Sequence, residues 1–105
     1  MRHEIILAPA AVKGFRRLPA HVRAEVRDAL ERHLRFEPAK VSTSRIKRLR
    51  GLSRPQYRLR IDEIRVFYDV TQTTVEVLAI VPKAEAQAWL EHKGTPSAGG
   101  GSGAG

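Results

Sequence analysis

The sequence contains no cysteine, and only Gly14 and Gly51 precede its glycine-rich last dozen residues. Without cysteine, the chain can form neither a disulfide framework nor a thiolate metal site, and it has no cysteine nucleophile. It also lacks a glycine-rich phosphate-binding loop and a G-x-S-x-G motif. The sequence therefore argues against P-loop enzymes and against serine hydrolases built on that motif.

Histidine clusters and long apolar runs are also missing. No pair of histidines has the H-x3-H or H-E-x-x-H spacing of a metal site, so we expect no metal and no other cofactor. No apolar run approaches the ~20 residues that a membrane span needs. The opening segment MRHEIILAP is too short for a secretory signal, so we expect a cytoplasmic protein without a membrane partner. The histidines are His3, His21, His33 and His92.

Basic residues are in excess. The chain has 19 Lys and Arg against 11 Asp and Glu, which gives a net charge of +8. Such an excess favours a polyanionic partner, namely RNA, DNA or an acidic protein. The alternative is that the charge only improves solubility, and the positions of the charges decide between the two.

A length of 105 residues indicates one domain. Residues 94–105 read GTPSAGGGSGAG, a composition that cannot bury apolar surface, and they are expected to form a flexible tail. The folded domain is therefore assigned to residues 1–93.

Periodicity predicts strands and helices in the order βααβββα. Strands are expected at residues 4–8, 57–61, 64–70 and 74–81, and helices at 9–18, 20–36 and 83–92. Residues 41–55 are expected to form a loop, held down by one short helical turn through Ile46, Leu49 and Leu52. This order predicts an α+β fold: a mostly antiparallel four-stranded sheet with two N-terminal helices on one face and a C-terminal helix.

The segment 57–70 has the pattern of a β-hairpin. If Asp62 and Glu63 form its turn, the register pairs Tyr57 with Tyr68, Leu59 with Val66 and Ile61 with Ile64 on an apolar core face. Arg60 then lies opposite Arg65, with Arg58 beside them on the other face.

Three like charges gathered on one side of a sheet oppose folding unless an anion binds. The guanidinium fork matches phosphate geometry, so Arg58, Arg60 and Arg65 predict an anion site. The alternative is that Asp69 and Glu76 neutralise them.

Further basic residues precede this hairpin, with no acidic residue between them and Arg60. They extend the predicted surface and are candidate RNA-binding residues. Trp89 allows two interpretations: packing in the core, or stacking on a base. The basic candidates are Arg45, Lys47, Arg48, Arg50 and Arg54.

The stretch RLRGLSRPQYRLRIDEIRVFYDVTQTTVEVLAIVPK, with KGFRRLPAHVRAEVRDAL upstream, resembles the RelE/ParE superfamily of bacterial toxins. The resemblance lies in the element order, the L-x-G before the second strand, the Y-R-L-R strand and the R-V-F-Y-D-V strand. It covers roughly residues 3–90.

The resemblance implies the toxin of a type II toxin–antitoxin system, bound by a cognate antitoxin. RelE-type members cut messenger RNA on the ribosome, and this activity, a metal-independent endoribonuclease that inhibits translation, is the leading expectation. A ParE-like inhibitor of DNA gyrase without catalysis is one alternative. The other is a degenerate member that only binds its antitoxin. Operator DNA is expected to be bound only through the antitoxin complex.

The resemblance also implies roles for individual residues. Arg58 and Arg60 match the basic strand positions that contact the scissile region, and Arg65 matches an arginine that binds the phosphate and the transition state. Lys83 falls near the basic residue that follows the fourth strand. RelE-type enzymes commonly place lysine on the second strand and tyrosine or histidine near the C-terminus. Because arginine stays protonated, neither Arg58 nor Arg60 is a general base, and Lys83 could serve only if burial or its cationic neighbours lowered its pKa.

Overall fold

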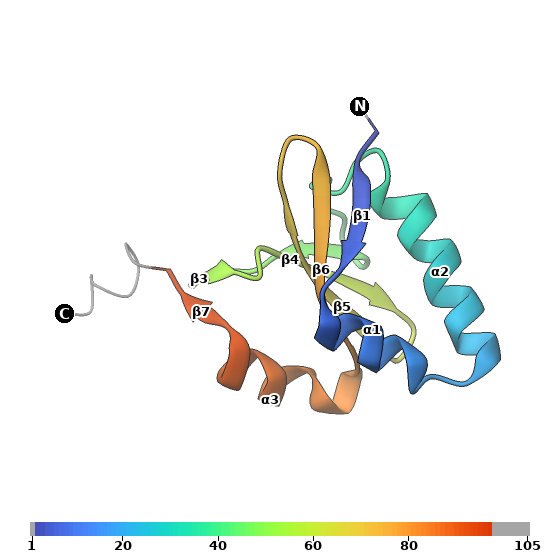
Figure 1. The fold of residues 1–105 in the computed structure, drawn as a ribbon. Coiled ribbons are helices and arrows are strands. Elements are labelled where there is room, and N and C mark those ends of the chain that lie inside the picture. Colours follow the sequence, from blue (N-terminus) through green and yellow to red (C-terminus); the bar gives the residue numbers. More distant parts are fainter. Residues whose placement is uncertain (1, 98–105) are drawn as a thin grey trace.

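The computed structural model describes residues 2–97. A five-stranded sheet with strand order β1-β6-β5-β4-β2 forms its centre, and β3 pairs with β7 in a separate two-stranded sheet (Figure 1). Strand β1 runs parallel to β6, and the other neighbours in the large sheet are antiparallel. The elements are β1 (Glu4–Leu7), α1 (Pro9–Arg16), α2 (Ala20–Leu34), β2 (Ile46–Arg48), β3 (Leu52–Arg54), β4 (Tyr57–Ile61), β5 (Ile64–Val70), β6 (Thr74–Pro82), α3 (Lys83–Lys93) and β7 (Thr95–Pro96).

The predicted α+β class is confirmed, and the predicted elements follow one another in the predicted order, with β2, β3 and β7 in addition. Proline explains where the helices start. Pro9 is the first residue of α1, where its missing N–H costs nothing, and Pro19 and Pro82 directly precede α2 and α3. Helices α1 and α2 end two residues before the predicted positions. After α1 the chain makes one turn of the tighter 3₁₀ type, in which the amide of Leu18 donates to the carbonyl of Phe15 at 3.1 Å.

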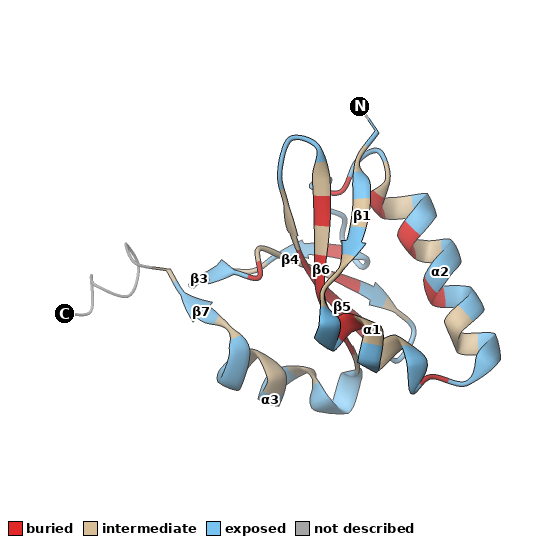
Figure 2. Cartoon of the chain, viewed as in Figure 1, coloured by how far each residue is buried: buried red, intermediate tan, exposed pale blue. Residues whose placement is uncertain are grey.

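The core lies between the sheet and helices α1 and α2 (Figures 1 and 2). We call this side of the sheet the core face; it carries the buried residues Leu59, Val66 and Tyr68. The hydroxyl of Tyr68 donates to the carbonyl of Pro38 at 2.6 Å. Burial, with Tyr57 beside it, raises the pKa of Tyr68, so the phenol stays neutral and keeps this donor.

Helix α3 lies on the opposite side of the sheet. Successive strand residues point to opposite faces, and Phe67, next to Tyr68, stacks on Trp89 of α3 with ring centroids 5.1 Å apart. None of the residues of α3 is buried (Figure 2). Apart from its ends, α3 is therefore held to the sheet largely by this aromatic contact.

The expected loop at residues 41–55 is the main difference in the fold. It contains no helical turn but two short strands, β2 and β3. Ile46 is buried and pairs with Leu59, which extends the antiparallel sheet by one strand. Strands of three residues are too short to leave a periodic pattern, so tertiary pairing rather than local propensity determines them.

The expected flexible tail from Gly94 begins with strand β7. Thr95 and Pro96 pair with β3, and the amide of Ser97 donates to the carbonyl of Gly51 at 2.9 Å. Gly51 has φ +78°, a conformation in which other residues are strained. The rest of the predicted tail, residues 98–105, lies outside the described residues.

Gly14 lets α1 cross the edge of β6 at close range. Strand β1 pairs with β6 only from Thr74 to Val77, and α1 covers the edge beyond that point. A Cβ atom added at Gly14 would clash with the backbone carbonyl oxygen of Ile80. Since this neighbour is backbone, the clash cannot be relieved by a side-chain rotation.

Gly14→Ala should therefore destabilise the protein although alanine favours helices by about 1 kcal/mol. We expect a net loss of about 1–3 kcal/mol in the free energy of unfolding, because α1 must move away from β6. Chemical denaturation measures it, with Arg16→Ala on the same helix as the control, for which a change within about 0.5 kcal/mol is expected. Equal or greater stability of Gly14→Ala would contradict this account of the contact.

Candidate nucleic-acid interface

The hairpin has the register predicted from the sequence. Tyr57 pairs with Tyr68, and Arg60 pairs with Arg65. Asp62 takes the positive φ of the turn, +50°, which aspartate tolerates better than most residues. The register places Arg58, Arg60 and Arg65 on the side opposite the core face. We call this side the arginine face and these three residues the arginine cluster.

Arg58 is the central member of the arginine cluster. Its Nε is buried and has no hydrogen-bond partner. Burial, together with the nearby charges of Arg65 and Arg60, lowers the pKa of Arg58. A partly buried donor that faces like charges is unfavourable in the free protein, because it loses hydration without gaining a partner. The arrangement suits an anion that accepts from this guanidinium.

Arg65 is held in place by the turn of the hairpin. It is only 7% exposed, and its Nη1 donates to the carbonyls of Asp62 at 2.7 Å and Ile64 at 3.0 Å. Arg60 is exposed. Within residues 2–97, no carboxylate forms an ion pair with any member of the arginine cluster.

Strand β2 brings one predicted basic residue to the arginine cluster and turns another away. Lys47 pairs with Arg58 across β2 and β4, which adds a cation to the arginine face. Arg45 instead lines a cavity of about 260 Å³ between α2 and β4, which Arg60 also lines. After burial, the charge of Arg45 is the next cause that lowers the pKa of His33. Arg45 therefore lies at the side of α2, and Arg60 borders this cavity as well as the arginine cluster.

Arg54 has carboxylate partners, unlike the arginine cluster. Its guanidinium pairs with Asp69 and with Glu76, each at 3.2 Å. Asp69 also accepts from the amide of Gln56 at 2.8 Å, and the side chain of Gln56 accepts from the amide of Val70 at 2.9 Å. The two acids proposed as neutralising partners of the cluster thus fix strand β3 to the sheet.

Not all of the other predicted residues lie on the arginine face. Arg48 pairs with Tyr57 and is 5.2 Å from its ring centroid, so it lies on the core-face side of the sheet, where it donates to the carbonyl of Gln56 at 2.8 Å. Arg50 is exposed. Lys83 is exposed at the first position of α3, and its amide donates to the carbonyl of Glu63 at 2.7 Å. Lys83 therefore lies at the turn end of the hairpin.

Sequence reasoning missed the aromatic part of this face. Phe67 pairs with Arg58 across β4 and β5, and it stacks on Trp89. The alternation along β5 placed Phe67 on the arginine face, but nothing in the sequence indicated that α3 would cross it. Tyr57 and Tyr68 lie on the core face, stacked with centroids 5.5 Å apart, as expected.

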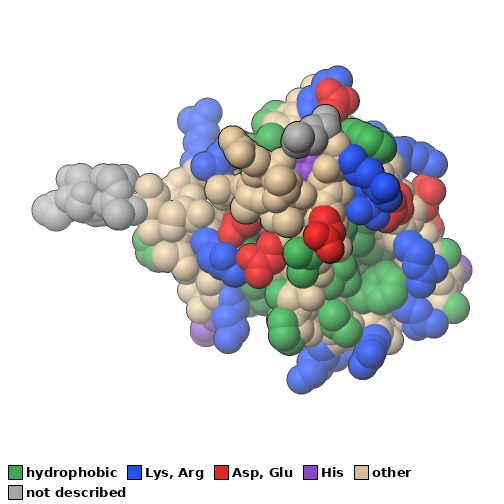
Figure 3. All heavy atoms as spheres, turned by 45° about the horizontal axis from the view of Figure 1, so that its top comes forward, with side chains coloured by type: hydrophobic (Ala, Val, Ile, Leu, Met, Phe, Trp, Pro, Cys, Tyr) green, Lys and Arg blue, Asp and Glu red, His purple; other side chains and the backbone are tan. Residues whose placement is uncertain are grey.

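The surface offers little other chemistry. Residues 2–97 contain no group of three or more His, Cys, Asp or Glu side chains placed to hold a metal ion. Among the helices in the described part of the chain, none has the length and apolar character required to cross a bilayer. Figure 3 shows Lys and Arg side chains spread over the visible side of the molecule, with hydrophobic, Asp and Glu side chains between them.

The Asp69 contacts predict a difference between the two acids. Asp69→Ala should cost about 1–3 kcal/mol, because the amide of Gln56 loses its acceptor while Arg54 loses its less exposed ion-pair partner. Glu76→Gln, at the more exposed end of the same ion-pair network, should cost less than about 1 kcal/mol. Urea denaturation of both variants tests this, and equal losses would show that Asp69 has no special role.

Arg58 predicts a gain in stability at the expense of anion binding. Arg58→Met keeps an unbranched side chain but removes the charge and the unpaired donor, so the free energy of unfolding should rise by about 1 kcal/mol. Added inorganic phosphate should stabilise the wild type more than this variant. Arg32→Gln serves as the control, since Arg32 pairs with Asp28 on α2. A destabilised Arg58→Met variant with an unchanged phosphate response would contradict the anion site.

Comparison with solved structures places the fold among known toxins. The toxin–antitoxin complex RelBE2 from Mycobacterium tuberculosis contains a chain with 23% identity and a TM-score of 0.64, matched over 78% of this chain and 99% of that one. For the RelB–RelE complex from Methanococcus jannaschii the identity is 18%, the TM-score 0.62 and the coverage 80% and 96%. The YoeB dimer from Staphylococcus aureus gives 16%, 0.54, 75% and 94%.

No curated protein matches the chain. Residues 5–87 match the family model described as the ParE toxin of the type II toxin–antitoxin system parDE. This match covers most of the chain and includes the whole β4–β5 hairpin. The chain therefore belongs to the ParE toxin family, within the RelE/ParE superfamily of type II toxins.

Proposed function

We propose that this toxin is a ribosome-dependent endoribonuclease that cuts messenger RNA and so inhibits translation. The observation that carries the proposal is the arginine cluster, where Arg58 has a buried Nε without a partner. Arg60 and Arg65 lie close enough to affect its pKa. An RNA phosphate is an anion that could accept from several guanidinium groups at once.

The reaction would be attack of a ribose 2′-hydroxyl on the adjacent phosphate. The new bond joins the 2′-oxygen to phosphorus, the bond to the 5′-oxygen breaks, and a 2′,3′-cyclic phosphate forms. The arginine cluster would orient the phosphate and stabilise the charge that develops on the phosphorane. Arginine does not give up its proton, so the cluster itself would transfer none. Lys83, exposed at the turn end of the hairpin, would donate a proton to the departing 5′-oxygen, and water would take the proton of the 2′-hydroxyl.

The other basic residues would extend the contact with RNA to different degrees. Lys47 adjoins Arg58 and Arg50 is exposed, so these two are proposed to contact the phosphates. Arg48 lies over Tyr57 on the core-face side of the sheet and would reach the RNA less directly. Arg45 would contribute from the side of α2. Arg54 is already paired with two carboxylates and would contribute least.

The arginine face is also the proposed contact surface of the cognate antitoxin. An antitoxin that blocks RNA must compete for the same guanidinium groups, so it should present acidic residues there. Operator DNA would be bound through the complex of the two proteins. Affinity for the antitoxin should fall as salt is raised, and it should fall less steeply for Arg60→Gln.

Inhibition of DNA gyrase is the second candidate, because the matching family model describes the toxin of parDE. In that case the protein would act by binding alone, through the exposed surfaces of its helices. The arginine cluster would then be dispensable for toxicity. The two candidates therefore differ in the residues and in the cellular damage that they predict.

Expression of the chain without an antitoxin separates these candidates. We expect growth arrest, with messages cut at a repeated position within codons and no DNA breaks. Arg60→Gln should abolish the arrest, because it removes one guanidinium of the arginine cluster. Since Arg60 is exposed, the substitution should leave the fold intact. Arg32→Gln on α2 should still cause the arrest. Intact messages together with DNA breaks, and full toxicity of Arg60→Gln, would replace the ribonuclease by the gyrase inhibitor.

A further inference from the structure

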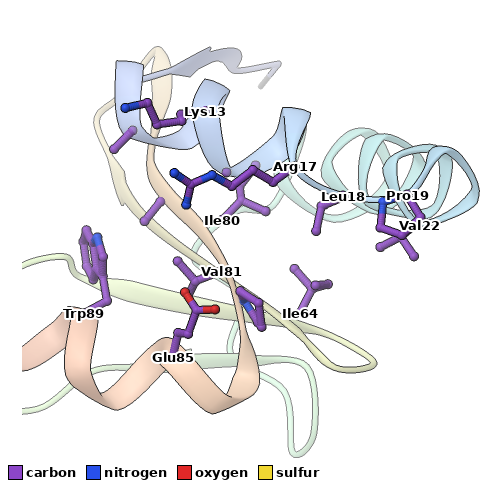
Figure 4. A pocket seen from close by; sticks show the side chains of 14 residues that line it. Lys13, Arg17, Leu18, Pro19, Val22, Ile64, Ile80, Val81, Glu85 and Trp89 are labelled. Atoms are coloured by element: carbon purple, nitrogen blue, oxygen red, sulfur yellow. The ribbon is translucent and has the colours of Figure 1, made fainter.

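A pocket of about 530 Å³ lies between α1 and α3, where strand β1 no longer covers the edge of β6. Its walls are mainly apolar, with Val81 on the β6 side (Figure 4). The charged groups are few: Lys13 comes from α1, Arg17 directly follows the end of α1, and Glu85 comes from α3. The α1 rim is therefore cationic, while the interior offers little hydrogen bonding.

Trp89 forms the aromatic wall of this pocket (Figure 4). One face of its ring is stacked on Phe67, and the two ring planes lie within 5° of each other. Trp89 is only partly buried, and it lines a second cavity on α3 as well. The indole thus has a fixed orientation and remains accessible from solvent.

Two strand pairings join the pocket to the arginine cluster. Phe67, on which Trp89 stacks, lies directly opposite Arg58. Val81 of the pocket lies directly opposite Arg65. Opposed residues on paired strands have Cβ atoms about 5 Å apart. The pocket therefore lies directly beside the arginine cluster.

We propose that this pocket is a subsite for an unpaired base of single-stranded RNA, with the base stacked on Trp89. This inference rests on the proposed function, since the RNA backbone would reach the pocket from the arginine cluster. Lys13 and Arg17 bind the phosphate of the stacked nucleotide at the α1 rim. Glu85 keeps phosphate away from the α3 side, so the base, not the phosphate, enters the pocket.

The lining determines which bases bind best. A wall of aliphatic side chains and one indole cannot read the hydrogen-bonding edge of a base, so discrimination depends on stacking. Purines stack over a larger area than pyrimidines, and the subsite prefers a purine.

Because the family model ends at residue 87, the match to that family does not extend to Trp89.

Trp89 is the only tryptophan in the chain, so its emission reports directly on the pocket. The full-length protein is titrated at low salt with oligoadenylate and with oligouridylate. We expect both to bind, and oligoadenylate to bind more tightly and quench Trp89 more strongly. Binding of labelled RNA, measured by anisotropy, provides affinities for variants that lack the fluorophore.

Two substitutions at position 89 separate stacking from simple packing. Trp89→Leu keeps an apolar contact with Phe67 but cannot stack a base, and should weaken oligoadenylate binding about tenfold. Trp89→Phe keeps a ring and should retain most of the affinity. Thermal unfolding establishes that both variants are folded. Lys13→Gln and Arg17→Gln should lower the salt dependence of binding, with Arg32→Gln as the control.

The outcomes distinguish this subsite from the proposed function. If RNA binds without changing the emission of Trp89, or if Trp89→Leu binds oligoadenylate as the wild type does, the subsite is overturned and the arginine face still stands. If Arg60→Gln remains fully toxic while Trp89 is quenched, the ribonuclease proposal falls and the base-binding pocket stands. If neither oligonucleotide binds the wild type, the base subsite is overturned, whereas the ribosome-dependent ribonuclease is still decided by message cleavage and by the toxicity of Arg60→Gln.

Discussion

The register of the β4–β5 hairpin is the constraint on which the rest of the structure depends. A strand has only two faces, and a shift by one residue exchanges them. The apolar residues that pair on the core face, Leu59 with Val66 and Tyr57 with Tyr68, can be buried only in this register. The same register forces Arg60 against Arg65, with Arg58 beside them. Formation of the core thus creates the arginine cluster.

Other charged residues, unlike the arginine cluster, have partners of opposite charge within the chain. On α2, Asp28 and Glu31 pair with Arg32 and Arg35 one turn later, and such pairs stabilise a helix modestly. Asp69 and Glu76 lie close to the arginine face, yet both pair with Arg54. Carboxylates are therefore available in the neighbourhood, but they hold strand β3 in place. The positive charge of the cluster is left for a partner from outside the chain.

Much of the fold and of the arginine cluster was predictable from the sequence, because both depend on patterns that repeat along the chain. Alternation in 57–70 gave the hairpin register, and helical periodicity gave α1 and α2. The short strands β2, β3 and β7 were missed, because each is defined by its pairing partner rather than by its own residues. The Arg54 contacts were missed for the same reason: they exist only once β3 lies against the ends of β5 and β6.

The position of α3 on the sheet could not be predicted from the sequence either, although the length of the helix was predicted closely. Helix α3 has no buried residue, so its apolar pattern is weak, and its docking depends on the stacking of Trp89 on Phe67. A helix held by one aromatic contact and by its two ends buries little surface. It leaves open a pocket that a tightly packed helix would fill.

The unfavourable charge arrangement and the choice of partner are linked by mass action. A ligand that binds only the folded state stabilises it, and the stabilisation is greatest where the free protein has an unmet interaction, as at Arg58 Nε. An acidic antitoxin that covers the arginine face would neutralise the charge repulsion within the arginine cluster, as bound RNA would in the free toxin. The same side chains would then account both for toxicity in the free protein and for tight, stabilising inhibition in the complex. Replacing them with apolar residues would improve the fold and remove both properties together.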